Sequence, residues 1–86
     1  MKILYAVPWV DSEPGWGTKF DEYQVFDDLE DCITRTKEAS KNGPTDSGCY
    51  YGPERPLHYI ETNDEIEGTF PQWIKSIKFK GSTNLI

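Results

Sequence analysis

Residues 22–44, "EYQVFDDLEDCITRTKEASKNGP", contain a strand pattern followed directly by a helix pattern. Within residues 22–26, Tyr23 and Val25 would share one face of an extended chain, which is typical of a short strand. Asp27 stands where a helix N-cap is expected, and Glu30 three residues later completes a variant of the capping box. The stretch therefore predicts a short strand that leads into a helix.

The predicted helix runs from Asp28 to Lys41. Acidic side chains fill its first turn and basic ones its second half, the arrangement that the helix dipole favours. Asn42-Gly43-Pro44 then ends the helix. Because its apolar residues recur in one stripe, we expect the helix to pack on a sheet by a single face. This stripe consists of Leu29, Cys32, Ile33, Thr36 and Ala39.

Strand and loop patterns flank this unit on both sides. Ile3–Val7 is apolar on both faces and ends at Pro8, so it predicts a strand in the interior of the sheet. Residues 11–20, "DSEPGWGTKF", are rich in Pro and Gly and predict a loop. Downstream, the patterns indicate a loop over residues 44–56, a strand over Leu57–Thr62, a helical turn at residues 64–67, a strand over residues 73–81 and a frayed end at 82–86.

A chain of 86 residues has room for a single domain, residues 1–86. The predicted order is β-β-α-β-β. The economical arrangement is an α+β fold, with a four-stranded, mainly antiparallel sheet and one helix packed on one face. Three Trp, five Tyr and four Phe residues can supply much of the core.

The net charge of −6 is unevenly distributed along the chain. Residues 11–31 contain eight acidic residues and one lysine, whereas residues 72–86 contain three lysines and no acid. The overall sign disfavours nonspecific binding to DNA or an anionic membrane, and it favours a partner protein with a basic surface. In the alternative interpretation, the acids are simply solvated loop and helix-start residues.

The N-terminal run "MKILYAVPWV" superficially resembles a signal peptide. Pro8 interrupts it, acidic residues follow it, and no small-residue cleavage site is in position. The run is also too short to span a bilayer. We therefore expect a soluble, cytoplasmic protein, in which Cys32 and Cys49 are free thiols because a secreted domain of this size usually carries more cysteines.

No familiar catalytic motif is present in the sequence. His58 and Glu61 face opposite sides of a strand, so they do not form a dyad. A structural zinc site needs four Cys or His ligands, and this chain has three at scattered positions. We therefore expect a protein that is not an enzyme and that has no metal and no cofactor.

Aromatic residues in two glycine-rich segments indicate a binding surface. Trp16 lies between two glycines, and residues 47–56, "SGCYYGPERP", contain two adjacent tyrosines. Trp, Tyr and Arg are enriched at interface hot spots, although loop aromatics can also cover the edge of a core. The predicted partner-binding residues are Trp16, Asp21, Glu22, Asp28, Asp31, Tyr50, Tyr51 and Arg55.

The adjacent tyrosines should have different roles, because neighbouring side chains of an extended chain point to opposite faces. We expect one of Tyr50 and Tyr51 to turn inward and cap the core, and the other to turn outward with Arg55. A third hypothesis, less favoured, uses the same three residues in a small enzyme or a nucleotide-sequestering protein.

An alternative function is RNA binding through the C-terminal lysines. Lys75, Lys78 and Lys80 are interleaved with Trp73 and Phe79, and such a pattern can neutralise phosphates and stack bases. Strand alternation also accounts for the two aromatic residues as part of the core.

A small, acidic, aromatic-rich chain of this kind resembles the accessory early proteins of T-even-like tailed phages. The likeness lies in "MKILYAVPWV", "VFDDLEDCITRTKEASK" and "YYGPERPLHYIE". It implies a protein of the host cytoplasm that inhibits a host enzyme, toxin or defence factor by direct binding. The expected function is therefore a non-enzymatic binding protein that inactivates a host defence or toxin component through an acidic, aromatic-rich surface.

Overall fold

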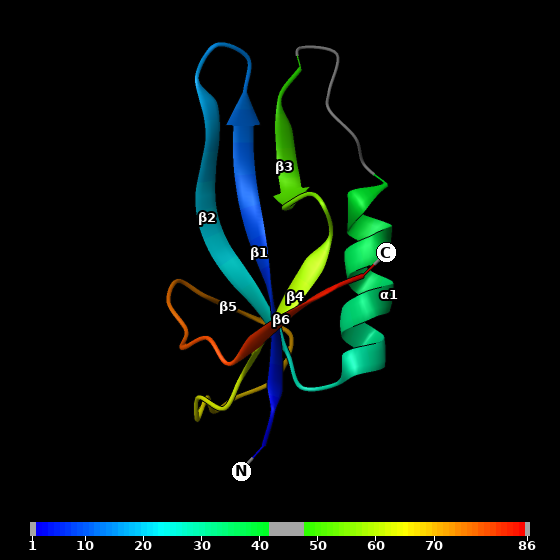
Figure 1. Ribbon diagram of the computed structural model, residues 1–86, viewed down its shortest axis with the longest axis vertical. Helices are drawn as coiled ribbons and strands as arrows, with labels where there is room; N and C mark the ends of the chain where they lie inside the picture. Colours follow the sequence, from blue (N-terminus) through cyan, green and yellow to red (C-terminus); the bar gives the residue numbers. More distant parts are fainter. Residues whose placement is uncertain (1, 42–47, 86) are drawn as a thin grey trace.

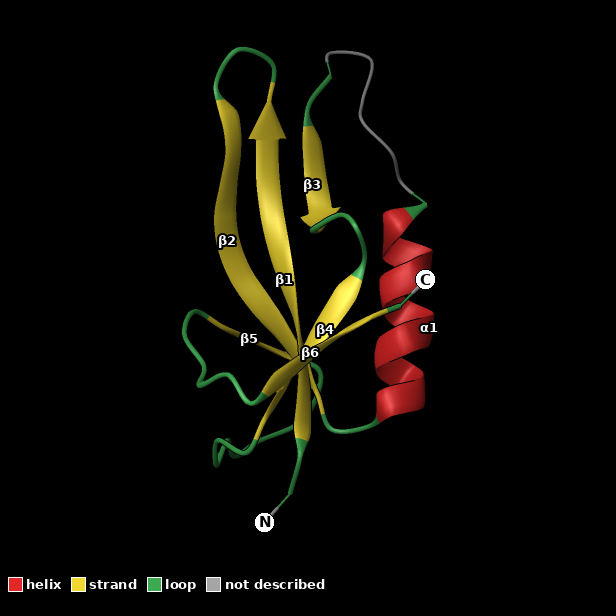
Figure 2. Ribbon diagram, viewed as in Figure 1, coloured by secondary structure: helices red, strands yellow, loops and turns green. Residues whose placement is uncertain are grey.

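The computed structural model describes residues 2–41 and 48–85 (Figure 1). One helix stands beside an antiparallel sheet (Figure 2), which confirms the α+β class. Within the described residues, however, the sheet has six strands and not the four that were predicted. In chain order the elements are β1 (Leu4–Glu13), β2 (Gly17–Phe26), α1 (Leu29–Ser40), β3 (Tyr50–Pro53), β4 (His58–Thr62), β5 (Gln72–Ile74) and β6 (Gly81–Asn84).

β1 lies at the centre of the sheet, whose strand order is β5-β2-β1-β4-β6. β2 occupies one edge of β1, and the other edge is shared by β4, opposite Leu4–Ala6, and β3, opposite Trp9–Ser12. Pro8 lies in the gap between these two partners, a position that tolerates a residue without an N–H group. The interior position of the first strand is confirmed, but this strand continues past Pro8 to Glu13.

Residues 11–20, predicted as a loop, form the end of a long β-hairpin. The turn is tight: the Trp16 N–H donates to the Glu13 carbonyl at 3.1 Å. Gly15 and Gly17 adopt φ angles of 80° and 82°, which residues with a Cβ rarely adopt. The prediction was wrong because side chains near the tip are exposed on both sides, so they lack the apolar alternation that reveals a strand.

α1 begins one residue later than predicted. Asp28, not Asp27, is the N-cap, and its carboxylate accepts a hydrogen bond from the Asp31 N–H at 2.8 Å. Asp27 instead lies 3.4 Å from the Lys2 ammonium. The helix ends at Ser40, one residue before the predicted end, and the predicted stop at residues 42–44 lies outside the described residues.

Both faces of the sheet carry a hydrophobic core. On the helix face, buried residues pack with the partly buried Leu29 and Leu85; they are Val7, Phe26, Cys32 and Tyr59. On the other face, Leu4, Ala6 and Val25 are covered by side chains of the segment that follows β4, namely Ile66, Phe70, Ile74 and Ile77. The helix therefore covers one face, and a largely irregular segment covers the other.

The C-terminal third differs most from the prediction. Residues 64–67 form no helical turn, and the single strand expected over residues 73–81 is replaced by β5 and β6, which lie at opposite ends of the strand order. The expected frayed end is also corrected: β6 pairs with β4, and the Leu85 N–H donates to the Leu57 carbonyl at 2.9 Å. Partners distant in sequence define these short strands.

Candidate protein-binding face

The two adjacent tyrosines point to opposite faces of the sheet. Tyr50 lies opposite Ser12 of β1, and Tyr51 lies opposite Asp11. Tyr51 is the outward one, with 54% of its surface exposed. Tyr50 is half-buried and packs over Gly52, where an added Cβ would come within 2.7 Å of the tyrosine hydroxyl.

Arg55 accompanies the half-buried tyrosine, so the predicted pairing with the outward one was wrong. Its guanidinium lies 5.0 Å from the centre of the Tyr50 ring and donates a hydrogen bond to the Ser40 carbonyl at 2.6 Å. The Tyr50 hydroxyl donates to the Pro53 carbonyl at 2.8 Å. These contacts tie β3 to the end of α1, which gives both side chains a structural role.

Tyr51 belongs to an aromatic cluster with two tryptophans, here called the Tyr51 cluster. The ring centre of Trp9 lies 5.2 Å from that of Tyr51 and 4.9 Å from that of Trp73. The register places all three rings on the helix face, because Trp9 alternates with Val7, and Trp73 lies opposite Gln24, the partner of Val7. Trp73 is 44% exposed, so two of the three rings are open to solvent.

A β-bulge directs a carboxylate at this cluster. β2 places two residues, Asp21 and Glu22, opposite the single residue Trp9. The Tyr51 hydroxyl donates a hydrogen bond to the Asp21 carboxylate at 2.9 Å. The pKa of Tyr51 is raised to about 12, first by partial burial, then by this hydrogen bond and by the charges of Asp21, Glu22 and Asp11. The phenol therefore lies in a region of negative potential.

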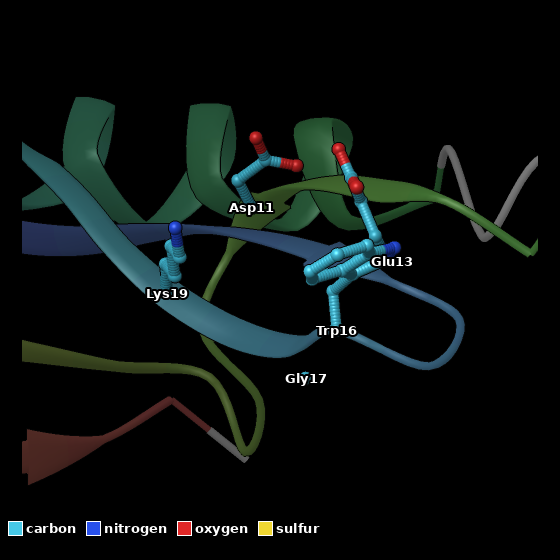
Figure 3. Close-up of a pocket in the computed structure, with 5 residues that line it drawn as sticks. All are labelled: Asp11, Glu13, Trp16, Gly17 and Lys19. Atoms are coloured by element: carbon cyan, nitrogen blue, oxygen red, sulfur yellow. The ribbon is translucent and has the colours of Figure 1, made fainter.

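A hollow of about 120 Å³ lies at the hairpin tip on the same face. It is lined by Asp11, Glu13, Trp16, Gly17 and Lys19 (Figure 3). Asp11 and Glu13 alternate with Trp9 along β1, so the hollow continues the surface of the Tyr51 cluster. We call the combined surface the acidic aromatic face; it consists of Trp9, Asp11, Glu13, Trp16, Asp21, Glu22, Tyr51 and Trp73.

The structure brings together some of the predicted binding residues and separates others. Four lie on the acidic aromatic face, namely Trp16, Asp21, Glu22 and Tyr51. Asp28 and Asp31 lie at the start of α1. Figure 1 shows this end of the helix in the half of the molecule away from the hairpin tip. Asp28 caps the helix, and Asp31 pairs with Arg35 at 2.9 Å. These two acids therefore contribute to the helix and not to the candidate face.

The C-terminal lysines are divided between two places. Lys75 lies 3.9 Å from the Glu22 carboxylate, beside the Tyr51 cluster. Lys78 and Lys80 line a different hollow with Phe79, whose ring packs edge-to-face with that of Tyr23, the ring centres being 6.4 Å apart. Because Tyr23 packs against the core on the face away from the helix, the three lysines do not gather around one set of aromatic rings.

Sequence reasoning did not include four residues of this face among the partner-binding residues, namely Trp9, Asp11, Glu13 and Trp73. The alternation of Val7, Trp9 and Asp11 could have identified Trp9, had the strand been continued through Pro8. No local signal could have placed Trp73 beside Trp9, because that contact depends on the pairing of β5 with β2.

Metal ligands, membrane-spanning helices and reactive His or Cys side chains are the other functional features to consider in the part of the chain that the structure describes. No group of three or more His, Cys, Asp or Glu side chains there could hold a metal ion, and no helix there has the length and apolar character needed to cross a membrane. His58 lies 3.8 Å from Glu54. Cys32 and Cys49 are free, and burial raises the pKa of Cys32 to about 12.

The fold and this face define a class of protein: a small α+β protein that exposes an acidic, aromatic surface on one side of its sheet. No protein-family model, curated protein or solved structure matches the chain.

Proposed function

We propose that this is a non-enzymatic binding protein whose acidic aromatic face contacts a basic surface of a partner protein. The contact inactivates a host defence or toxin component, as the resemblance to phage accessory proteins implies. The observation that carries the proposal is the Tyr51 cluster, where exposed aromatic rings pack on Trp9 and one of them is hydrogen-bonded to the Asp21 carboxylate.

Packing fixes the rings of this cluster before any partner arrives. Trp9 contacts both exposed rings, and Asp21 holds the Tyr51 hydroxyl. Side chains that are already ordered lose less conformational entropy on association. Exposed Trp and Tyr side chains with this support are typical of the residues that dominate binding energy at protein interfaces.

The carboxylates of the face supply specificity for a basic partner. Asp11 and Asp21 lie close enough to Tyr51 to raise its pKa, and a positive partner surface would be attracted to the same region. The charges disfavour RNA at this face, because its phosphates would be repelled. Lys75, which the alternative function needs, lies beside Glu22, so its charge is partly offset.

Affinity capture from a bacterial host lysate, followed by binding measurements on the purified partner, tests the proposal. Tyr51→Ala should raise the Kd roughly five-fold or more, equivalent to about 1 kcal/mol, because it removes an exposed ring of the cluster. Phe79→Ala is the matched control, since it removes an exposed ring from the other face and should leave the Kd unchanged. Capture of the partner should persist after nuclease treatment of the lysate.

A lysine variant separates the two functions. Changing Lys75, Lys78 and Lys80 to glutamine should leave capture intact if the acidic aromatic face is the contact. Loss of capture in this variant, together with loss of a salt-sensitive RNA complex, would instead support the RNA-binding alternative. Equal effects of Tyr51→Ala and Phe79→Ala would also count against the proposed face.

A further inference from the structure

We propose that the hollow at the tip of the β1–β2 hairpin is a subsite for one arginine side chain of the partner. This inference rests on the proposed function and adds the chemical identity of a contacting residue. It combines an exposed indole, two carboxylates on one side of a strand, and a hollow of side-chain size.

Trp16 forms the aromatic wall of the hollow. With 81% of its surface exposed, it is the most exposed of the large hydrophobic side chains in the described residues. The tight turn that begins at Glu13 holds its backbone. Figure 3 shows its indole ring beside Glu13, on the side of the hairpin that bears the carboxylates. An exposed indole face attracts a cation, and a planar guanidinium can stack on it.

Two carboxylates complete the site. Asp11 and Glu13 project from β1 on the same side, about 6.5–7 Å apart along the strand. Within residues 2–41 and 48–85, neither carboxylate takes part in an ion pair. A guanidinium carries five N–H donors in a planar fork, so it can bond a carboxylate while it stacks on the ring. An ammonium lacks the planar surface for stacking.

The size and charge of the hollow limit what it can hold. Its volume of about 120 Å³ is below the roughly 300–1,000 Å³ of pockets that enclose a small-molecule ligand, so a single side-chain head group is the fitting occupant. Lys19 lies opposite Asp11 in the register, and Figure 3 shows its ammonium at the end of the hollow away from Trp16. This charge competes with an incoming cation.

Nuclear magnetic resonance titration with three blocked peptides tests the inference on the intact protein. The peptides Gly-Ser-Xaa-Ser-Gly carry arginine, lysine or citrulline, the neutral analogue of arginine, at Xaa. The arginine peptide should shift the indole N–H signal of Trp16. The lysine peptide should bind at least about three-fold more weakly than the arginine peptide. The citrulline peptide should leave the indole N–H signal of Trp16 unchanged.

Variants of the lining residues give the matching controls. Glu13→Gln should weaken binding of the arginine peptide about three-fold. Lys19→Gln should strengthen its binding, because the competing positive charge is removed. Equal binding of the lysine and arginine peptides, binding of the citrulline peptide, or no effect of Glu13→Gln would overturn the inference.

The same variants distinguish failure of the subsite from failure of the proposed function. If Tyr51→Ala impairs partner capture while Glu13→Gln changes neither capture nor peptide binding, the subsite is wrong and the proposed function stands. If the arginine peptide binds at Trp16 but no protein is captured through Tyr51, the proposed function fails and the cation chemistry of the hollow is supported.

Discussion

Asp27 and Asp28 are neighbours with the same side chain, yet only Asp28 caps the helix. Its backbone is extended, with φ −129° and ψ 126°, so its carboxylate can fold back onto the Asp31 N–H. Asp27 forms an exposed ion pair with Lys2 instead. The sequence pattern predicted an acidic N-cap, and the backbone conformation determines which of the two aspartates fills that position.

This difference predicts unequal effects of two otherwise identical substitutions. Asp28→Ala should lower the free energy of unfolding by about 0.5–2 kcal/mol, because the first turn loses its side-chain acceptor. Asp27→Ala should change it by no more than about 0.5 kcal/mol, because exposed ion pairs contribute little. Urea denaturation of both variants measures the two effects, and a larger loss for Asp27→Ala would show that the helix starts one residue earlier.

At the scale of elements, β6 shows that a strand can form with no apolar pattern of its own. All four of its residues, Gly81–Asn84, are exposed. Pairing with β4 and the packing of the following residue, the partly buried Leu85, against the helix-side core hold it in place. Because neither contact is local, the sequence of this segment alone resembles a frayed terminus.

Deletion of residues 81–86 should therefore destabilise the protein. The free energy of unfolding should fall by about 2 kcal/mol or more, because the packing of Leu85 is lost and one edge of β4 loses its partner. The exposed substitution Thr83→Ala is a suitable control and should stay within about 0.5 kcal/mol. An unchanged denaturation midpoint in the truncated protein would mean that the terminus contributes nothing to the fold.

On the scale of the whole molecule, two hydrophobic cores lie on opposite faces of one sheet, and α1 covers one of them. Cys32 lies on the buried side of the helix, whereas Cys49 is only partly buried before β3. Burial raises the pKa of the Cys32 thiol to about 12 and keeps reagents away from it. Its exposure requires the helix to leave the sheet, so its reactivity reports on opening of the fold.

The two thiols should accordingly react at different rates with an excess of a thiol reagent under native conditions. Cys49 should react first, and Cys32 should react only as fast as the helix-side core opens. Cys49→Ser should remove the fast phase, and Cys32→Ser should leave it unchanged. If both thiols of the native protein reacted at one rate, Cys32 would not be closed off by the helix.

The sequence by itself determined the features that depend on near neighbours along the chain. The helix was predicted to within about one residue at each end, because caps and apolar spacing are local properties. The interior position of the first strand followed from its two apolar faces, and the opposite orientation of Tyr50 and Tyr51 followed from strand geometry. The excess of acidic residues over residues 11–31 was equally visible.

Only the tertiary structure decided which of these residues meet. The bulge in β2 turns Asp21 toward Tyr51, and β5 brings Trp73 to Trp9. Both contacts join residues that are 30 or more positions apart in the sequence. Strand register sets them, and register depends on long-range pairing and the packing of both cores, which no local pattern specifies.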